Sequence, residues 1–200
     1  MSMETWSAGH LPGLREDEMA WHVLPFAAAG QQVQVRVPVL TPAQLGAVTR
    51  RVKAASAQHL KTLPVSRIVQ IVDAAVRRLL DPADPMRREA EHLLPVVSGY
   101  DAEMVRLGLN GFLQSFRAPQ LHRFVAEDFA NPKLLDEFQP APKGGAVRAF
   151  GPELLVHSWA GNVPALPLWS LACGLLVKAG TVGKLPSAEP VFASLFARLL

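Results

Sequence analysis

The segment from Leu154 to Pro190 alternates apolar runs with polar turns, and the order of these runs constrains the fold more than any other feature of the sequence. An apolar run ends at the turn 159–164, and a long apolar helical segment follows it. A second short strand then ends at Lys184, and a Pro–Ser turn leads into another helix. This order of strand, loop, helix, strand and helix opens a parallel α/β sheet. Ligands of such sheets bind beyond the carboxyl ends of the strands, where Asn162 and Lys184 stand.

The N-terminal part predicts a strand pair followed by a layer of helices. Residues 33–39 alternate apolar with polar, which is typical of a half-buried strand, and residues 23–26 are expected to pair with it. Because Pro38 cannot donate a hydrogen bond to a ladder, we expect this strand to lie at an edge or to end there. Caps and apolar spacing predict helices within 41–138, from Thr41–Pro42, at 65–80, from Asp84–Pro85, from Asp101, around 120–129 and after Asn131–Pro132.

A change in composition divides the chain near residue 145. The stretch 140–145, PAPKGG, is the best linker candidate. After it the charges thin out and the apolar runs become continuous, as in strands and helices buried around a parallel sheet. We therefore predict an α/β fold of two units. Residues 1–145 form the strand pair and helical layer, and 146–200 form the first β-α-β-α of an incomplete Rossmann-like cofactor domain.

Composition excludes several classes of protein. The formal charge is +3, from 20 basic and 17 acidic residues, and no basic cluster interleaves with aromatics, so no nucleic-acid partner is expected. The N-terminus lacks a signal-peptide pattern. The most apolar stretch, 163–177, is short for a membrane span and contains two prolines. A single cysteine allows no intrachain disulfide framework, so we expect a cytoplasmic protein.

The common catalytic and metal-binding motifs are missing. The six histidines show no paired ligand spacing, and with one cysteine the sequence predicts no metal site. No G-x-S-x-G elbow, no phosphate-binding G-x-x-x-x-G-K-[ST] loop and no G-x-G-x-x-G fingerprint occurs. A nucleotide would therefore have to bind by other means.

Three residues each admit two interpretations. Cys173 lies inside the apolar helix, where a buried thiol is an inert packing group, whereas a nucleophile needs exposure and nearby positive charge. We expect packing. Asn162 is either a turn residue that bonds its own backbone or an amide donor aimed into an active site. Lys184 is either a solvated strand end or a contact to a ribose or phosphate.

Two stretches together resemble a known family. HSWAGNVPALPLWSL (157–171) and LLVKAGTVGKLPSAEPVFASLF (175–196) are similar to the acyl-CoA reductases of the aldehyde dehydrogenase superfamily. They resemble in particular the LuxC-like fatty-acyl reductase of bacterial bioluminescence. The shared features are the A-G-N-V-P turn and a later Lys that is followed by a polar turn, an acidic residue and Pro. The resemblance is sharp over 93–200 and diffuse over 1–92.

The resemblance implies roles for residues of both turns. Asn162 would be an oxyanion-hole donor, and Lys184 would contact the adenosine ribose of the cofactor, with Gly161 and Trp159 beside it. Ser187 stands where many NAD-preferring relatives carry a Glu. Because a neutral Ser does not repel a 2′-phosphate, the resemblance implies NADPH. Glu189 complicates this expectation, since it could fold back towards the ribose.

The resemblance also implies a reaction. A cysteine takes the acyl group of an acyl-CoA or acyl-protein thioester, and hydride from the nicotinamide then yields the aldehyde. That cysteine belongs downstream of both turns, so Cys173 cannot serve. We therefore expect an N-terminal part of a larger enzyme, inactive alone, homo-oligomeric at full length, with a possible acyl-transferring protein partner. The alternatives are an acyl-phosphate reductase, an aldehyde dehydrogenase or a non-catalytic nucleotide-binding module.

Overall fold

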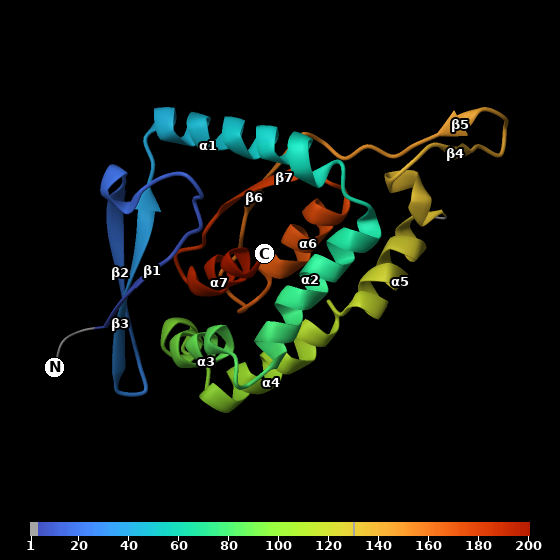
Figure 1. Cartoon of the computed structure of the whole chain (residues 1–200). Helices are drawn as coiled ribbons and strands as arrows, with labels where there is room; N and C mark the ends of the chain where they lie inside the picture. Colours follow the sequence, from blue (N-terminus) through green and yellow to red (C-terminus); the bar gives the residue numbers. More distant parts are fainter. Residues whose placement is uncertain (1–3, 130) are drawn as a thin grey trace.

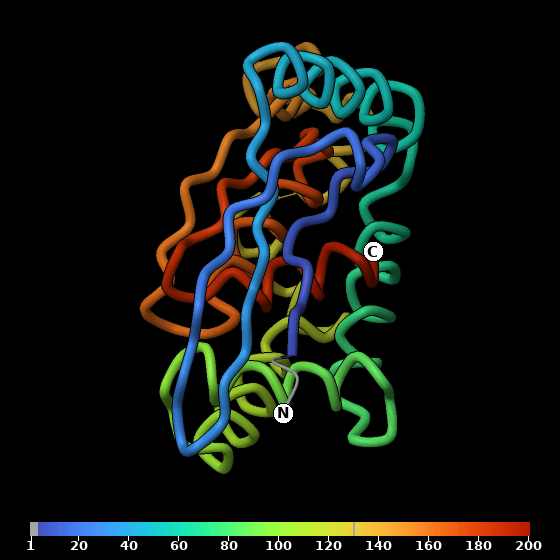
Figure 2. Tube along the Cα trace, turned by 90° about the vertical axis from the view of Figure 1, so that its left-hand side faces the viewer, coloured from blue at the N-terminus to red at the C-terminus, as the bar shows by residue number. Residues whose placement is uncertain are grey.

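The chain opens with a small sheet, shown in a computed structural model that describes residues 4–129 and 131–200. Strands β1 (Glu4–Ser7), β2 (Ala20–Ala28) and β3 (Gln31–Val39) lie in the order β1-β3-β2. The pairing of β2 with β3 is antiparallel, as predicted, and β1 is parallel to β3. Ala29 and Gly30 both have positive φ, 50° and 76°, which suits the tight turn of a two-residue hairpin. The hairpin runs the height of the molecule, from α1 down to α3 (Figure 2).

Of the two outcomes expected for the strand containing Pro38, the edge position is wrong, because β3 is the central strand, but the strand does end one residue after Pro38, at Val39. The physical reason is that β1 ends at Ser7, which pairs with Arg36. Pro38 therefore lies beyond the last residue that β1 reaches, and in the described part of the chain the sheet is two strands wide there. A missing N–H is tolerated at such a position.

The helical layer begins where its capping residues predicted. Its helices are α1 (Pro42–Ala55), α2 (Val65–Leu80), α3 (Pro85–Ser98), α4 (Ala102–Gln114) and α5 (Ala118–Asp128), with a π-helical turn at Ser56–Leu60 and 3-10 turns at Glu16–Glu18 and Pro132–Leu135. Thr41 and Gln44 form a reciprocal capping box at α1. The Asp84 and Asp101 carboxylates each accept a backbone N–H at 2.8 Å. These caps satisfy donors that a helix start leaves unpaired.

The predicted linker forms the tip of a small hairpin. Strands β4 (Gln139–Pro140) and β5 (Ala146–Val147) pair antiparallel and extend away from the body of the molecule (Figure 1). One cluster of buried apolar side chains nevertheless includes residues from both predicted units, from Trp6 to Phe196. The division near residue 145 stays a prediction.

The C-terminal segment forms the strand–helix–strand–helix unit that its pattern predicted. Strands β6 (Leu154–Ser158) and β7 (Gly180–Lys184) are parallel, with α6 (Pro167–Leu176) between them in sequence and α7 (Val191–Leu199) after them. Helix α6 covers one face, where Gly174 lies against Leu155 and Thr181, and α1 covers the other. Continuous burial of these strands was expected, but Val156 is 74% exposed. The sheet has only two strands among the described residues, so much of its α1-facing surface lines a cavity.

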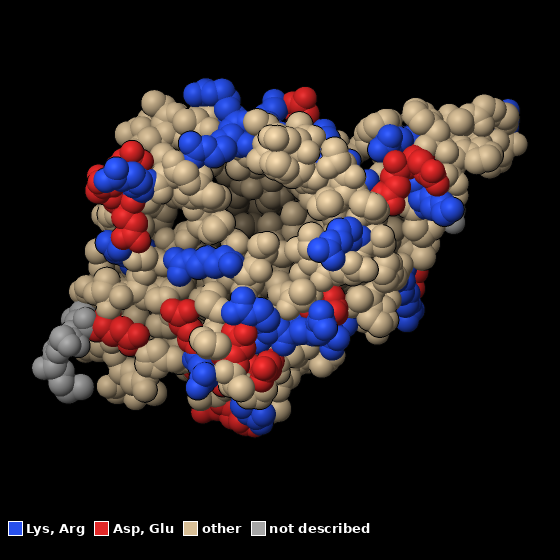
Figure 3. Space-filling view, viewed as in Figure 1, with Lys and Arg blue, Asp and Glu red and all other residues tan. Residues whose placement is uncertain are grey.

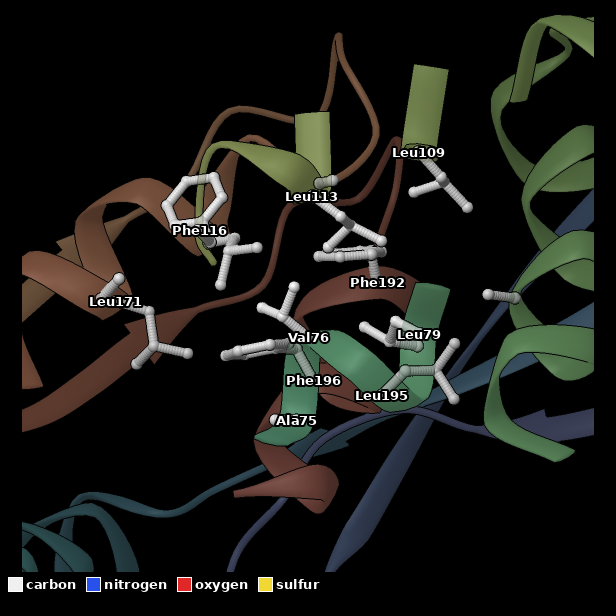
Figure 4. Packing of buried hydrophobic residues seen from close by; sticks show 14 of the residues in the cluster. Ala75, Val76, Leu79, Leu109, Leu113, Phe116, Leu171, Phe192, Leu195 and Phe196 are labelled. Atoms are coloured by element: carbon white, nitrogen blue, oxygen red, sulfur yellow. The ribbon is translucent and has the colours of Figure 1, made fainter. Parts of the chain in front are cut away.

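Helix α7 anchors this unit in the helical layer. Phe192, Leu195 and Phe196 are fully buried and pack among side chains of α2 and α4 (Figure 4). Each such side chain contributes about 1.5–3 kcal/mol when removed from water. The labelled residues around them include Val76 and Leu79 on α2, Leu109 and Leu113 on α4, and Phe116 just after α4. Across residues 4–129 and 131–200, no helix has the length and apolar character needed to cross a membrane.

Helix α6 ends in a turn that normally contains glycine. Lys178 has φ +59°, and the N–H groups of Lys178 and Ala179 donate to the carbonyls of Leu175 and Gly174 in a Schellman pattern. A non-glycine residue there costs about 1–2 kcal/mol. The Lys178 ammonium forms an ion pair with Asp136 at 2.6 Å, and the same carboxylate accepts the Val65 N–H that begins α2. One carboxylate thus joins the entry of β7 to the helical layer.

A buried arginine ties three helices together. Arg87 on α3 is 1% exposed, and its guanidinium donates to the Leu79 carbonyl of α2, the Arg106 carbonyl of α4 and the Glu91 carboxylate. The Leu79 carbonyl lies in the last turn of α2, where carbonyls otherwise lack partners, whereas the Arg106 carbonyl lies within α4.

We predict that Arg87→Met lowers the free energy of unfolding by about 3–5 kcal/mol, because Glu91 and two carbonyls lose their donor. The matched variant Arg88→Met changes an exposed neighbour and should stay within about 0.5 kcal/mol of the parent. Urea unfolding of both variants measures the difference. Equal effects would contradict the anchoring role of Arg87.

Candidate functional site

The β6–β7 ladder brings the two polar turns together. Its register pairs Ser158 with Lys184, and the Trp159 N–H then donates to the Lys184 carbonyl at 3.3 Å. The two chains leave the sheet side by side at its carboxyl edge, which is where ligands of parallel sheets bind. The predicted proximity of the two turns is therefore present.

Gly161 allows the two turns to pack closely. A Cβ at this position would lie 2.8 Å from the Pro186 Cβ and 3.0 Å from the Glu189 nitrogen. Contacts that short require displacement, so a larger residue would push the turns apart. The structure gives Gly161 a packing role, and its contact with a cofactor stays a prediction.

The Trp159 indole is fixed by contacts on several sides. Its Nε1–H donates to the Ser170 hydroxyl of α6 at 2.8 Å, and its ring stacks on His157 with centroids 5.8 Å apart. The ring also occupies the place of a side chain at Gly183, where any Cβ would collide with it. Burial lowers the pKa of His157, so this imidazole is neutral near pH 7.

A cavity of about 600 Å³ lies between α1, the β2–β3 hairpin, β6–β7 and α7. In the space-filling view it is the hollow beneath α1, and its visible floor is uncharged (Figure 3). Trp159, Lys184 and Ser187 line it, whereas Asn162 and Gly161 do not. Among the described residues no Asp or Glu lines this cavity.

Asn162 lies in the first turn, with an exposed side chain. Its backbone carbonyl accepts the Tyr100 hydroxyl at 3.3 Å, and within the described residues its amide group has no hydrogen-bond partner. Ala165 in the same turn has φ +70°, an unusual conformation for alanine. The local bonds expected of an ordinary turn Asn are therefore not seen, and the amide is available to a ligand.

Glu189 points away from the cavity. It is 1% exposed, and its Oε1 accepts the N–H groups of Val191 and Phe192 at 2.7 and 2.9 Å at the start of α7. Its Oε2 is buried without a partner among the described residues. Burial raises the pKa of this carboxyl to about 7 although the two N–H groups oppose the rise. The expectation that Glu189 could fold back towards a ribose is not met.

Cys173 is half-buried on α6. Burial, with the nearby Asp128 carboxylate, raises the pKa of its thiol above the ordinary value. A protonated thiol is a poor nucleophile, so both observations favour the packing role. No cluster of three or more His, Cys, Asp or Glu side chains suited to a metal ion occurs within 4–129 and 131–200.

The N-terminal half supplies cavity residues that sequence reasoning missed. His10 and His22 line the cavity, and the Gly9 N–H donates to the Ser194 hydroxyl of α7 at 2.7 Å. Partial burial and the Arg198 guanidinium lower the pKa of His10. No local pattern could have found these residues, because they lie more than 130 positions from the turns they face.

We predict that Glu189→Gln changes the pH dependence of stability. Because the folded pKa of about 7 exceeds the ordinary 4.5, the parent loses stability as pH rises from about 4.5 to 7. The total loss is about 3 kcal/mol. The amide keeps the acceptor for α7 without titrating, so the variant should lack this slope. Urea unfolding from pH 4.5 to 8 measures it, and identical slopes would contradict the assignment.

Known proteins share this arrangement of helices and strands. A search of curated proteins found no match. Among solved structures, aldehyde dehydrogenase 21 from Physcomitrella patens, in complex with the reaction product succinate, superposes with a TM-score of 0.71 at 15% identity. That match covers 100% of this chain and 40% of the plant protein. A structure of Gox0499, described for its cofactor and substrate selection, gives a TM-score of 0.60 at 17% identity, covering 90% and 38%.

These likenesses establish the fold, an α/β arrangement of the aldehyde dehydrogenase kind, and the chain spans about 40% of the length of such structures. The sequence also matches the profile of the acyl-CoA reductase (LuxC) family over residues 60–200, which is more than half of the chain. The resemblance inferred from the two turns is thereby confirmed. The chain belongs to the LuxC family of acyl-CoA reductases.

Proposed function

We propose that this chain supplies the cofactor edge of an NADPH-dependent reductase. The enzyme converts a fatty acyl thioester, an acyl-CoA or an acyl-protein, to the aldehyde through a cysteine acyl-enzyme. The observation that carries the proposal is the position of Lys184 and Ser187 on a cavity without a described carboxylate. Membership of the acyl-CoA reductase family supports an oxidoreductase of the acyl or aldehyde kind.

The charges around the cavity fit a phosphorylated ribose. Lys184 is exposed and forms no ion pair within the described part of the chain, so its ammonium is free to meet an anion. Ser187 is neutral and can donate a hydrogen bond. Glu189, the nearest acidic residue in sequence, is turned into the core. A 2′-phosphate, which carries a charge of about −1.5 to −2 at neutral pH, meets no described carboxylate here.

The proposed reaction uses residues of this chain together with a nucleophilic thiol that this chain does not provide. The bound dihydronicotinamide would supply hydride. The exposed Asn162 amide is suited to donate a hydrogen bond to the oxyanion that develops when a thiol attacks the acyl carbonyl. Cys173 is unsuited to be that thiol, because it is half-buried on α6 and burial raises its pKa. The proposal therefore requires a nucleophilic cysteine outside these 200 residues.

Because the reductase proposal depends on a thiol from elsewhere in the protein, there is a second candidate function, a non-catalytic nucleotide-binding module. A cavity lined by Lys184 and Ser187 would suffice to bind a nucleotide whether or not a thiol completes the site. Binding without thiol-dependent turnover in the intact protein would select the module. Turnover with acyl phosphate or aldehyde, and none with acyl-CoA, would select another reaction of the superfamily.

We predict that Lys184→Ala weakens NADPH binding about 10- to 100-fold, since a hydrogen bond to a charged group contributes about 1.5–3 kcal/mol. Lys143→Ala removes the same charge from the hairpin tip and should leave the dissociation constant within about twofold. Calorimetric titration of the intact protein measures both variants. No NADPH binding by the parent would reject the proposal.

A companion variant tests the cofactor preference. Ser187→Glu places a negative charge beside the expected 2′-phosphate, so NADPH affinity should fall by at least about tenfold, while NADH affinity stays level or rises. Ser187→Gln is the uncharged control of the same length. An equal loss for both cofactors would speak against a 2′-phosphate at this position.

We predict that Asn162→Ala lowers kcat of the intact enzyme by roughly 10²–10³, as loss of one oxyanion donor typically does. The dissociation constant for NADPH should change less than about twofold, because the amide does not line the cavity. Asn162→Asp keeps the size but removes the donor and should be equally impaired. Unchanged turnover in Asn162→Ala would eliminate the oxyanion role.

A further inference from the structure

A second, smaller cavity lies at the opposite end of the β6–β7 ladder. It has a volume of about 90 Å³ and is bounded by the end of α6 and the segment that enters β6, including Gly151 and Val177. The Gly180 N–H donates to the Glu153 carbonyl at 3.3 Å and marks this end of the sheet. A strand of five residues spans roughly 16 Å, which separates this cavity from Lys184.

Three cationic side chains line this cavity. Lys178 is 7% exposed, and Lys61 and Arg148 are half-buried. Lys178 forms an ion pair with Asp136, whereas Lys61 and Arg148 form none among the described residues. No Asp or Glu of the described chain lines the cavity itself. Three cations against the one carboxylate of Asp136 leave a local charge of about +2.

Other acidic groups nearby are already engaged. The Glu153 carboxylate forms an ion pair with Lys53 at 2.5 Å. Lys53, and more weakly Lys61, lower its pKa, so it is ionised at neutral pH. Glu153 therefore reduces the field of Lys61 only in part and does not enter the cavity.

Arg148 has a donor without an acceptor. Its Nε is fully buried and has no hydrogen-bond partner among the described residues. Its guanidinium lies over the Phe150 ring at 4.9 Å from the centroid, which orients the side chain. Buried donors are nearly always paired, so an unpaired one beside a cationic cavity indicates a missing acceptor.

The backbone conformation of Lys178 also indicates a ligand at this cavity. This residue holds φ +59° at a position where glycine is usual. Non-glycine residues in this conformation cost free energy and cluster at functional sites. Here the side chain reaches the cavity and Asp136 together.

We propose that this cavity binds a phosphate dianion, either free or as the end of a phosphomonoester. A dianion matches the local charge of about +2, and its oxygens can accept from Arg148 Nε and both ammonium groups. The volume holds more than one water, each of which occupies about 30 Å³ in the liquid, but not a nucleotide. The inference is independent of the reductase proposal, because the two cavities share no residues.

Calorimetric titration of the intact protein with inorganic phosphate tests the site. Arg148→Ala and Lys61→Ala should each weaken binding at least about tenfold, while Lys143→Ala should stay within about twofold. Thermal unfolding of each variant shows whether it is folded. If Arg148→Ala does not fold, Lys61→Ala provides the test of the site. NADPH affinity should be the same in all three.

A second titration distinguishes the sources of phosphate. Binding of CoA, and not of 3′-dephospho-CoA, that is lost in Arg148→Ala would identify a phosphomonoester. Binding of inorganic phosphate alone would identify the free anion. Absence of phosphate binding to the parent, together with CoA binding that Arg148→Ala leaves unchanged, would overturn the proposal, and so would an equal loss in Lys143→Ala.

Discussion

The parallel pairing of β6 with β7 is the interaction on which the candidate site depends. Its hydrogen bonds set Ser158 beside Lys184, so the two turns leave the sheet together. A shift by one residue would turn Lys184 to the opposite face of the sheet. Two strands alone are marginally stable, and the ladder is held by α1 on one face and α6 on the other. The ion pair of Lys178 with Asp136 fixes its entry.

Helix α7 connects this edge to the rest of the molecule. Its aromatic side chains lie in the core formed with α2 and α4, and its first N–H groups bond to Glu189. That carboxyl is consequently withdrawn from the cavity. The segment that joins β7 to α7 therefore starts a helix of the core. Its polar side chains on the cavity are Lys184 and Ser187. Stability and the polarity of the cavity are set by one local arrangement.

Much of the fold followed from local pattern. The alternation in β3 and the caps Thr41, Asp84 and Asp101 predicted elements that the structure contains, because each signal acts within a few residues. Other expectations failed where distant partners decide. The central place of β3 depends on β1, a strand that no pattern within β3 records.

By itself the sequence determined the strand–helix–strand–helix unit, the two turns and the family, because these reside in contiguous residues with characteristic spacing. Tertiary structure alone decided that Glu189 turns inward, that Gly161 must be small, and that Lys184 shares a cavity with His10 and His22. It also gathered Lys61, Arg148 and Lys178. The physical reason is that burial and charge at a site depend on chain segments brought together by packing, which no local pattern records.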